Sequence, residues 1–212
     1  MHYTLAHTFQ HYMLGLFAVA NNFSALGLFL SVCGGVPKDE QRKLVNIATL
    51  TAFITMIVAF FIGDGVLRFF GISLGAFQIA GGLLLCTSGI GMLNAKSPSK
   101  ENAVQEEDFS SVISEAVVPI GIPLTTGAGT ISTIIIYSAD AATWMGRIPL
   151  LAAIFVMTVI IYLIFRYSTR LFKVLGATGM NVLIKVMGLI TLALGIQFIV
   201  VGISKVFPSL MQ

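Results

Sequence analysis

The chain contains very little charge. Only 10% of its 212 residues are Asp, Glu, Lys or Arg, whereas 57% are hydrophobic, and the mean hydropathy is +0.95. A soluble domain needs enough polar residues to cover an apolar core, and this composition does not supply them. The scarcity of charge therefore excludes a water-soluble globular protein and predicts a protein that crosses a membrane several times.

Other features that are scarce exclude further classes of protein. The two cysteines, Cys33 and Cys86, form no C-x-x-C pair and have no spaced histidine partners, so neither a disulfide framework nor a zinc site is expected. The first residues lack the basic segment and the cleavage site of a signal peptide, and we expect Met1 to be the mature start. The net charge of +3 comes from Lys and Arg placed between apolar segments, so nucleic-acid binding is not expected.

Six apolar stretches approach or exceed the length of about 20 residues that crosses a bilayer as an α-helix. They are residues 12–32, 44–62, 72–93, 116–137, 148–165 and 186–203. Residues 95–111 are rich in Ser, Glu and Lys and are predicted to form a polar cytoplasmic linker. The predicted fold is an all-α membrane protein in which residues 1–212 form a single transmembrane domain of six helices.

The distribution of Lys and Arg predicts the orientation, because cytoplasmic loops retain an excess of positive charge. Nine of the 12 Lys and Arg residues fall on one side of the predicted spans, and Arg68, Arg147 and Lys205 fall on the other. This bias predicts that both termini lie on the non-cytoplasmic side of the cell inner (plasma) membrane.

The sequence matches itself at a shift of 106 residues. The shift places Gly82 on Gly188, and segment 21–27 on segment 127–133. It therefore pairs the third predicted span with the sixth and the first with the fourth.

Two repeats of three helices follow from this pairing, residues 1–94 and residues 112–212. Because three spans are an odd number, the two repeats would lie in the membrane with opposite orientations. Inverted repeats of this kind are common among secondary transporters.

Glycine recurs at every seventh residue in the third and sixth spans, at Gly75, Gly82 and Gly89 and at Gly188, Gly195 and Gly202. A stripe of the smallest side chain lets two helix backbones approach closely. Both stripes are interpreted as packing surfaces and not as ligand sites.

Two of the spans carry polar and helix-breaking residues at corresponding positions. The first contains NNFSALG at residues 21–27, and the fourth contains PIGIPLTTGAGTIST at residues 119–133. Prolines remove amide donors and glycines lower helix propensity, so we expect the first and fourth helices to be broken. Irregular backbone survives inside a membrane only where protein covers it or where it lines a water-filled cavity.

The two breaks are predicted to meet and to form a substrate-binding site. Its candidate residues are Asn21, Asn22, Ser24, Thr125, Thr126, Gly127, Gly129, Thr130 and Ser132. No charged residue lies deep in any span, but a broken helix offers an N-terminus to an anionic group and C-terminal carbonyls to a cationic one. A small neutral amino acid presents one group of each kind. The alternative that stays open is structural, with Ser, Thr and Asn joining helices.

The same lack of buried charge bears on the mechanism. Asp64, just past the second span, is expected to be solvated at the end of a loop. No cofactor or metal ion is expected, while a sodium ion or a proton stays open as a coupling ion. An enzyme is not expected, since the spans contain no nucleophile–base pair and no cluster of metal ligands.

Four segments of this sequence resemble the MarC family of bacterial and archaeal inner-membrane proteins: GLFAVANNFSALGLFLSV, FGISLGAFQIAGGLLL, AVVPIGIPLTTGAGTIST and KVMGLITLALGIQFIVVGI. The resemblance covers essentially the whole chain and implies membership of the wider LysE-like transporter group. Relatives in that group look like transporters of small neutral amino acids such as glycine and alanine. Direction of transport, oligomeric state, export of another small metabolite and a non-transporting scaffold all stay open.

The sequence departs from the family pattern at the breaks. That pattern is Asn-Pro-x-Gly-x-x-Pro in the first span, where Asn22, Ser24 and Gly27 here replace the Pro, the Gly and the second Pro. It is Gly-Pro-Gly in the fourth, where Ala128 replaces the proline. Losing prolines restores amide donors and makes a more regular first helix possible, which leaves open whether activity differs from that of relatives.

Overall fold

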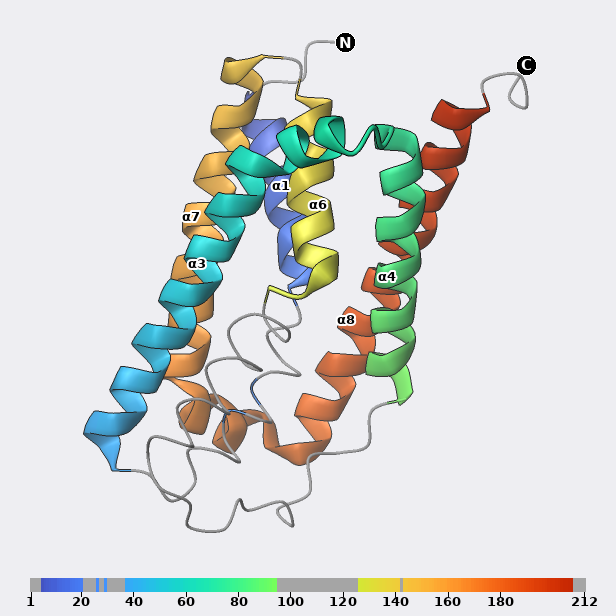
Figure 1. Cartoon of the computed structure of the whole chain (residues 1–212). Helices are drawn as coiled ribbons and strands as arrows, with labels where there is room; N and C mark the ends of the chain where they lie inside the picture. The colour runs from blue at the N-terminus through green and yellow to red at the C-terminus, as the bar shows by residue number, and fades with distance from the viewer. Residues whose placement is uncertain are drawn as a thin grey trace.

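The computed structural model describes residues 5–20, 26, 29, 37–94, 126–141 and 143–207, and contains helices and short connections in this part of the chain. The helices are α1 (Leu5–Val19), α3 (Lys38–Phe69), α4 (Leu74–Asn94), α6 (Ala128–Asp140), α7 (Trp144–Arg166) and α8 (Ser168–Val206) (Figure 1). The all-α prediction is therefore confirmed for these residues. The predicted linker, residues 95–111, lies outside the described residues.

Four of these helices, α3, α4, α7 and α8, are long and apolar enough to cross a membrane. Helices α1 and α6 have only 15 and 13 residues. At a rise of 1.5 Å per residue they are about 22 and about 20 Å long, which is less than the hydrocarbon thickness of about 30 Å. Helix α1 overlaps the start of the first predicted span, residues 12–32, and α6 overlaps the end of the fourth, residues 116–137.

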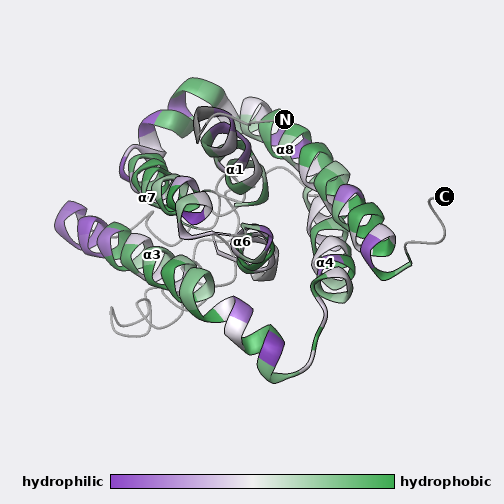
Figure 2. Ribbon diagram, turned by 90° about the horizontal axis from the view of Figure 1, so that it is seen from above, coloured by the Kyte–Doolittle hydropathy of each residue, from purple (hydrophilic) through white to green (hydrophobic). Residues whose placement is uncertain are grey.

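The two short helices lie in the middle of the bundle (Figure 2). Helix α1 packs against α7, α6 and α8, while α6 also packs against α3 and α4. The outward faces of the long helices are as apolar as the interior, and Ile54, Leu83 and Phe155 are each more than half exposed. Such a surface suits lipid, which is as apolar as the side chains that face it.

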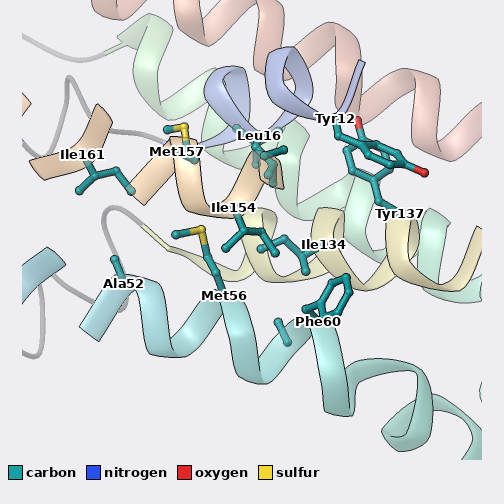
Figure 3. Packing of buried hydrophobic residues seen from close by; sticks show 14 of the residues in the cluster. Tyr12, Leu16, Ala52, Met56, Phe60, Ile134, Tyr137, Ile154, Met157 and Ile161 are labelled. Carbon is teal, nitrogen blue, oxygen red and sulfur yellow. The ribbon is translucent and has the colours of Figure 1, made fainter. Parts of the chain in front are cut away.

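The main core lies where α1, α3, α6 and α7 meet (Figure 3). Met56 and Phe60 of α3, Ile134 of α6, and Ile154 and Met157 of α7 are all fully buried in it. These side chains hold the short helix α6 against two helices of membrane-spanning length.

Helices α4 and α8 run in opposite directions and pack through their glycine stripes. The facing pairs are Gly75 with Gly202, Gly82 with Gly195, and Gly89 with Gly188. A Cβ atom added to Gly82 would lie 2.5 Å from the carbonyl oxygen of Gly195, and one added to Gly195 would lie 2.7 Å from that of Gly82. The predicted packing role of both stripes is confirmed, and each stripe is the partner of the other.

Two helices extend well beyond their predicted spans. Helix α3 covers Lys38–Phe69 and α8 covers Ser168–Val206, although the apolar windows are only 44–62 and 186–203. A helix can continue past its apolar window, because water and polar side chains can satisfy its end groups. Acidic residues in the first turn of α3 also suit the positive end of its dipole.

Asp64 corrects one expectation, because it is not at a solvated loop end. It lies inside α3 and forms ion pairs with Arg68, at 3.1 Å, and with Arg147 of α7, at 3.7 Å. Its side chain is 24% exposed. Asp64 therefore ties α3 to α7 at the end of the bundle that holds the start of α1 and the end of α8, which we call the terminal end (Figure 1). The opposite end, with the start of α3, is the basic end.

The glycine seam predicts a large difference between two alanine substitutions in α4. Gly82→Ala should destabilise the protein by about 1–3 kcal/mol, because the new methyl group meets helix backbone that cannot turn away. Gly91→Ala has open space around it and should be neutral or stabilising by up to about 1 kcal/mol. Thermal unfolding in detergent micelles measures both, and equal unfolding temperatures would contradict the close approach.

Candidate functional site

Helix α1 ends inside the first predicted span, two residues before Asn21. In a continuous helix the carbonyl of Ala18 would accept the amide of residue 22. In the structure this carbonyl accepts a hydrogen bond of 2.7 Å from the hydroxyl of Thr191, a buried residue of α8. The last helix of the chain thus supplies a donor to the end of the first.

Helix α6 begins inside the fourth predicted span. Gly127 is its N-cap residue, with φ −58° and ψ 172°, and no side chain caps this end. The carbonyl of Gly127 accepts the amide of Ile131 at 3.2 Å, whereas the amides of the first turn have no carbonyl within the helix to bond. The start of α6 therefore presents amide donors and the positive end of a helix dipole.

The two helix ends lie against each other. A Cβ atom added to Gly129 would lie 3.4 Å from Cγ1 of Val19, the last residue of α1, and 2.6 Å from Cδ2 of Leu85 in α4. Figure 1 shows both ends about halfway along the long helices α3 and α7. The negative end of one helix dipole and the positive end of another therefore meet inside the bundle.

The candidate residues that the structure describes lie around the start of α6. Thr126 and Thr130 are fully buried, while Gly127 is half-buried. Ser132 is buried on the face toward α4, where a Cβ atom added to Gly81 would lie 3.0 Å from the Cβ of Ser132. Ser132 thus packs between helices, one turn away from the helix start.

The other candidates cannot be placed beside them. Asn21, Asn22, Ser24 and Thr125 lie outside the described residues. Their participation in a site stays a prediction.

Aromatic rings pack closely between α1 and α6 on the terminal side of the two helix ends. The ring centroids of Tyr12 and Tyr137 are 4.8 Å apart (Figure 3). Those of Tyr137 and Phe198 are 6.2 Å apart. The Tyr137 hydroxyl lies so close to Gly15 that any Cβ atom there would overlap with it. Since both tyrosines are buried, these rings close the space between α1 and α6 on that side.

A polar cluster joins the end of α6 to its neighbours. Asp140 accepts a hydrogen bond of 2.6 Å from Lys205 of α8 and one of 3.3 Å from the side-chain amide of Gln78 of α4. Gln78 is buried, and its Oε1 atom has no hydrogen-bond partner among the described residues. The hydroxyl of Ser138 donates to the carbonyl of Phe60 in α3 at 3.2 Å. The terminal half of α6 is thereby attached to three helices.

Sequence reasoning missed Thr191, Gln78 and Asp140. Gln78 was detectable as a polar side chain within an apolar span, and Asp140 lies three residues beyond the predicted end of the fourth span. Thr191 carries no comparable signal, because a single threonine in an apolar helix usually bonds its own backbone. Thr191 does so as well, with the carbonyl of Met187 at 2.9 Å.

The described helices define a polytopic α-helical membrane protein in which two short helices end against each other in the interior. Among the residues that the structure describes, no group of three or more His, Cys, Asp and Glu side chains could hold a metal ion.

The sequence pattern of the MarC family integral membrane proteins matches residues 6–207, and the chain belongs to that family. It is 33% identical over 202 residues to the UPF0056 membrane protein YhcE of Escherichia coli K12, covering 95% of this chain and 94% of the relative. It is 32% identical over 201 residues to a UPF0056 membrane protein of Buchnera aphidicola subsp. Schizaphis graminum, with coverages of 95% and 94%. A UPF0056 membrane protein of Pyrococcus horikoshii is 32% identical over 200 residues, with coverages of 94% and 96%. No solved structure matches the chain.

The hydrogen bond to the end of α1 predicts the effect of Thr191→Val. This change keeps the side-chain shape but leaves the Ala18 carbonyl without its hydroxyl donor, and should cost about 1–3 kcal/mol. Thr158→Val is the matched control, because the Thr158 hydroxyl donates only to Ile154 of its own helix. Thermal unfolding in micelles should separate the two variants. Equal losses would mean that the contact between α8 and α1 contributes no stability.

Proposed function

We propose that the protein is a secondary transporter of small neutral amino acids, of the size of glycine or alanine. The observation that carries this proposal is the meeting of two helix ends at Val19 and Gly129. Amides of the first turn of α6, which have no acceptor within their own helix, suit the carboxylate of an amino acid, and carbonyls at the end of α1 suit its ammonium group. None of the described charged residues is buried, which favours a substrate without net charge.

The surroundings of the helix ends favour a small substrate. Leu85 is fully buried and lies against Gly129, and Val19 is also buried. Apolar side chains this close to the start of α6 leave little room for a bulky side chain on the substrate. The buried Thr126 and Thr130 belong to the same turn and the residues just before it.

We also infer that the protein is built from two inverted repeats with six spans, and three contacts support this. Cys86 and Leu192 are equivalent at the shift of 106 residues, and the Cys86 thiol lies 3.9 Å from the Leu192 carbonyl oxygen. A Cβ atom added to Gly195 would lie 2.9 Å from the amide nitrogen of Cys86. A Cβ atom added to Gly89 would lie 2.8 Å from the amide nitrogen of Leu192. The shift of 106 residues relates Gly89 to Gly195 and Cys86 to Leu192. The contact between Gly195 and Cys86 therefore corresponds to the contact between Gly89 and Leu192, as expected beside a two-fold axis.

The positions of the helix ends support the same inference. Helix α1 ends at Val19, and the N-cap of α6 is Gly127, which the shift of 106 residues aligns with Asn21. Both predicted breaks therefore fall at nearly the same position of their repeats. Residues outside the described part of the chain would complete the first and fourth spans.

Alternating access would move α6 relative to the helices around its terminal half. The packing of Tyr137 against Gly15 and the ion pair between Asp140 and Lys205 close this side. A substrate that enters or leaves there requires both contacts to separate. The glycine seam between α4 and α8 provides a rigid element against which α6 can move. Uptake and export, and sodium and proton coupling, stay open.

We further propose a location in the cell inner (plasma) membrane with both termini outside the cytoplasm. The start of α1 and the end of α8 lie at the same end of the bundle, and the start of α3, with Lys38, Arg42 and Lys43, lies at the other (Figure 1). The excess of basic residues at that other end favours its placement in the cytoplasm.

Uptake of labelled glycine into proteoliposomes tests the proposed transport. Wild-type protein should give saturable uptake that unlabelled alanine inhibits. Thr130→Val removes a buried hydroxyl from the first turn of α6 and should lower the rate by about tenfold or more, as loss of a hydrogen bond to a charged group does. Asn21→Ala tests the predicted contribution of the first break in the same assay.

Ser204→Ala is the control variant, because the Ser204 hydroxyl donates to Val201 in the last turns of α8, away from the helix ends. It should retain wild-type uptake. Absence of flux with every protein, wild type included, would favour the non-transporting scaffold, for which the helix-joining hydroxyls of Ser138 and Thr191 provide independent support.

The proposed orientation predicts the behaviour of fusions to the C-terminus after residue 212. In a bacterial host, fused alkaline phosphatase should be active, because it would reach the periplasm, whereas fused green fluorescent protein should stay dark. The same reporters inserted after residue 100 should give the opposite result. A fluorescent C-terminal fusion would contradict the orientation without affecting the proposed site.

A further inference from the structure

The first eight residues of α8 form a separate helical segment. Gly176, with φ +65° and ψ 177°, interrupts the helix, so residues 168–175 and 177–206 point in different directions. Figure 1 shows the first segment crossing the basic end of the bundle, where the lower part of α8 turns toward α7. We call residues 168–175 the surface helix.

The surface helix has one face on the protein. Ser168, Leu171, Phe172 and Leu175 follow the spacing i, i+3, i+4 and i+7 that places side chains on one helical face. Ser168 is buried, and the other three pack against the hydrophobic core. The surface helix therefore lies flat on the end of the bundle, with its opposite face outward.

The outward face is cationic. Arg166, at the end of α7, and Arg170 and Lys173 are all exposed. The Arg170 guanidinium lies 5.7 Å from the centre of the Tyr167 ring, which is half exposed, and Val174 is 84% exposed beside them. None of the three cations forms an ion pair with any acidic residue in the described part of the chain.

The terminal end of the bundle is different. Its three basic residues, Arg68, Arg147 and Lys205, are all paired with carboxylates of the protein. Arg166, Arg170 and Lys173 differ from them, because no carboxylate among the described residues pairs with these three cations. A partner that binds these cations should be anionic, and it should also offer an apolar region that contacts the exposed side chains of Val174 and Tyr167.

We propose that the surface helix binds anionic phospholipids, with its cations on lipid phosphates and its exposed apolar side chains at the boundary with the acyl chains. Helices that lie in the membrane interface combine such cations with apolar side chains, and arginine pairs with phosphate through two parallel hydrogen bonds. In the proposed orientation the lipids belong to the cytoplasmic leaflet. This inference does not depend on transport.

The single tryptophan of the chain makes a direct test possible. Trp144 is exposed at the start of α7, at the terminal end, so the wild-type protein reports on lipids there. Combining Trp144→Phe with Tyr167→Trp moves the only reporter to the surface helix, and indole can still stack on Arg170. Both proteins are reconstituted into phosphatidylcholine vesicles containing either brominated phosphatidylglycerol or brominated phosphatidylcholine, whose bromines quench tryptophan fluorescence on contact.

The Tyr167→Trp reporter should be quenched by brominated phosphatidylglycerol with a relative association constant about threefold or more above that for phosphatidylcholine. The Trp144 reporter should show no preference. Arg166→Gln, Arg170→Gln and Lys173→Gln combined should remove the preference, whereas Arg170→Lys alone, which keeps the charge, should retain most of it. High salt should weaken it.

Equal quenching of the Tyr167→Trp reporter by the two lipids would overturn the proposal, and so would a preference that survives the triple substitution. Size-exclusion chromatography of each variant before reconstitution verifies that it is folded. Because quenching is measured without substrate, failure here and failure of glycine uptake are independent outcomes.

Discussion

The structure depends on one constraint, which is that backbone amides and carbonyls inside a membrane need partners. An unpaired group costs several kcal/mol in hydrocarbon, so a helix cannot simply end there. Helix α1 nevertheless ends at Val19 and α6 begins at Ala128, both in the interior of the bundle. Protein surrounds both ends, and Thr191 donates to a carbonyl of α1. At the start of α6, the amides of the first turn have no carbonyl acceptor within their own helix.

The glycine seam positions the residues that enclose these helix ends. Thr191 lies between Gly188 and Gly195 on α8, and Leu85 lies between Gly82 and Gly89 on α4. Because the two backbones are in contact along these glycines, α4 and α8 pack as one closely joined pair of helices. That pair presents the hydroxyl of Thr191 to α1 and the side chain of Leu85 to α6. The glycine stripes, which serve only in packing, therefore determine where Thr191 meets α1 and where Leu85 meets α6.

Features that repeat along the sequence could be predicted, and single long-range pairs could not. The seven-residue glycine period predicted the seam. The apolar windows predicted six spans, and four of the described helices are long and apolar enough to cross a membrane. Prolines and glycines predicted an irregular fourth span; α6 begins at Ala128, and the residues of this span before Thr126 lie outside the described part of the chain. In contrast, the pairing of Asp64 with Arg147 joins two helices whose contact has no local signal. The ion pair between Asp140 and Lys205 could not be predicted either, because it also joins two helices whose contact has no local signal.

The hydrogen bond between Thr191 and Ala18 joins residues that are 173 positions apart. A ribosome therefore releases the first helix long before the residue that completes its end has been made. Until Thr191 has been made, the Ala18 carbonyl lacks this donor, and an unpaired carbonyl is costly in hydrocarbon. A chain truncated before α8 would keep the residues that pack α1 against α6 and α7, but it would lack the hydroxyl that donates to the Ala18 carbonyl.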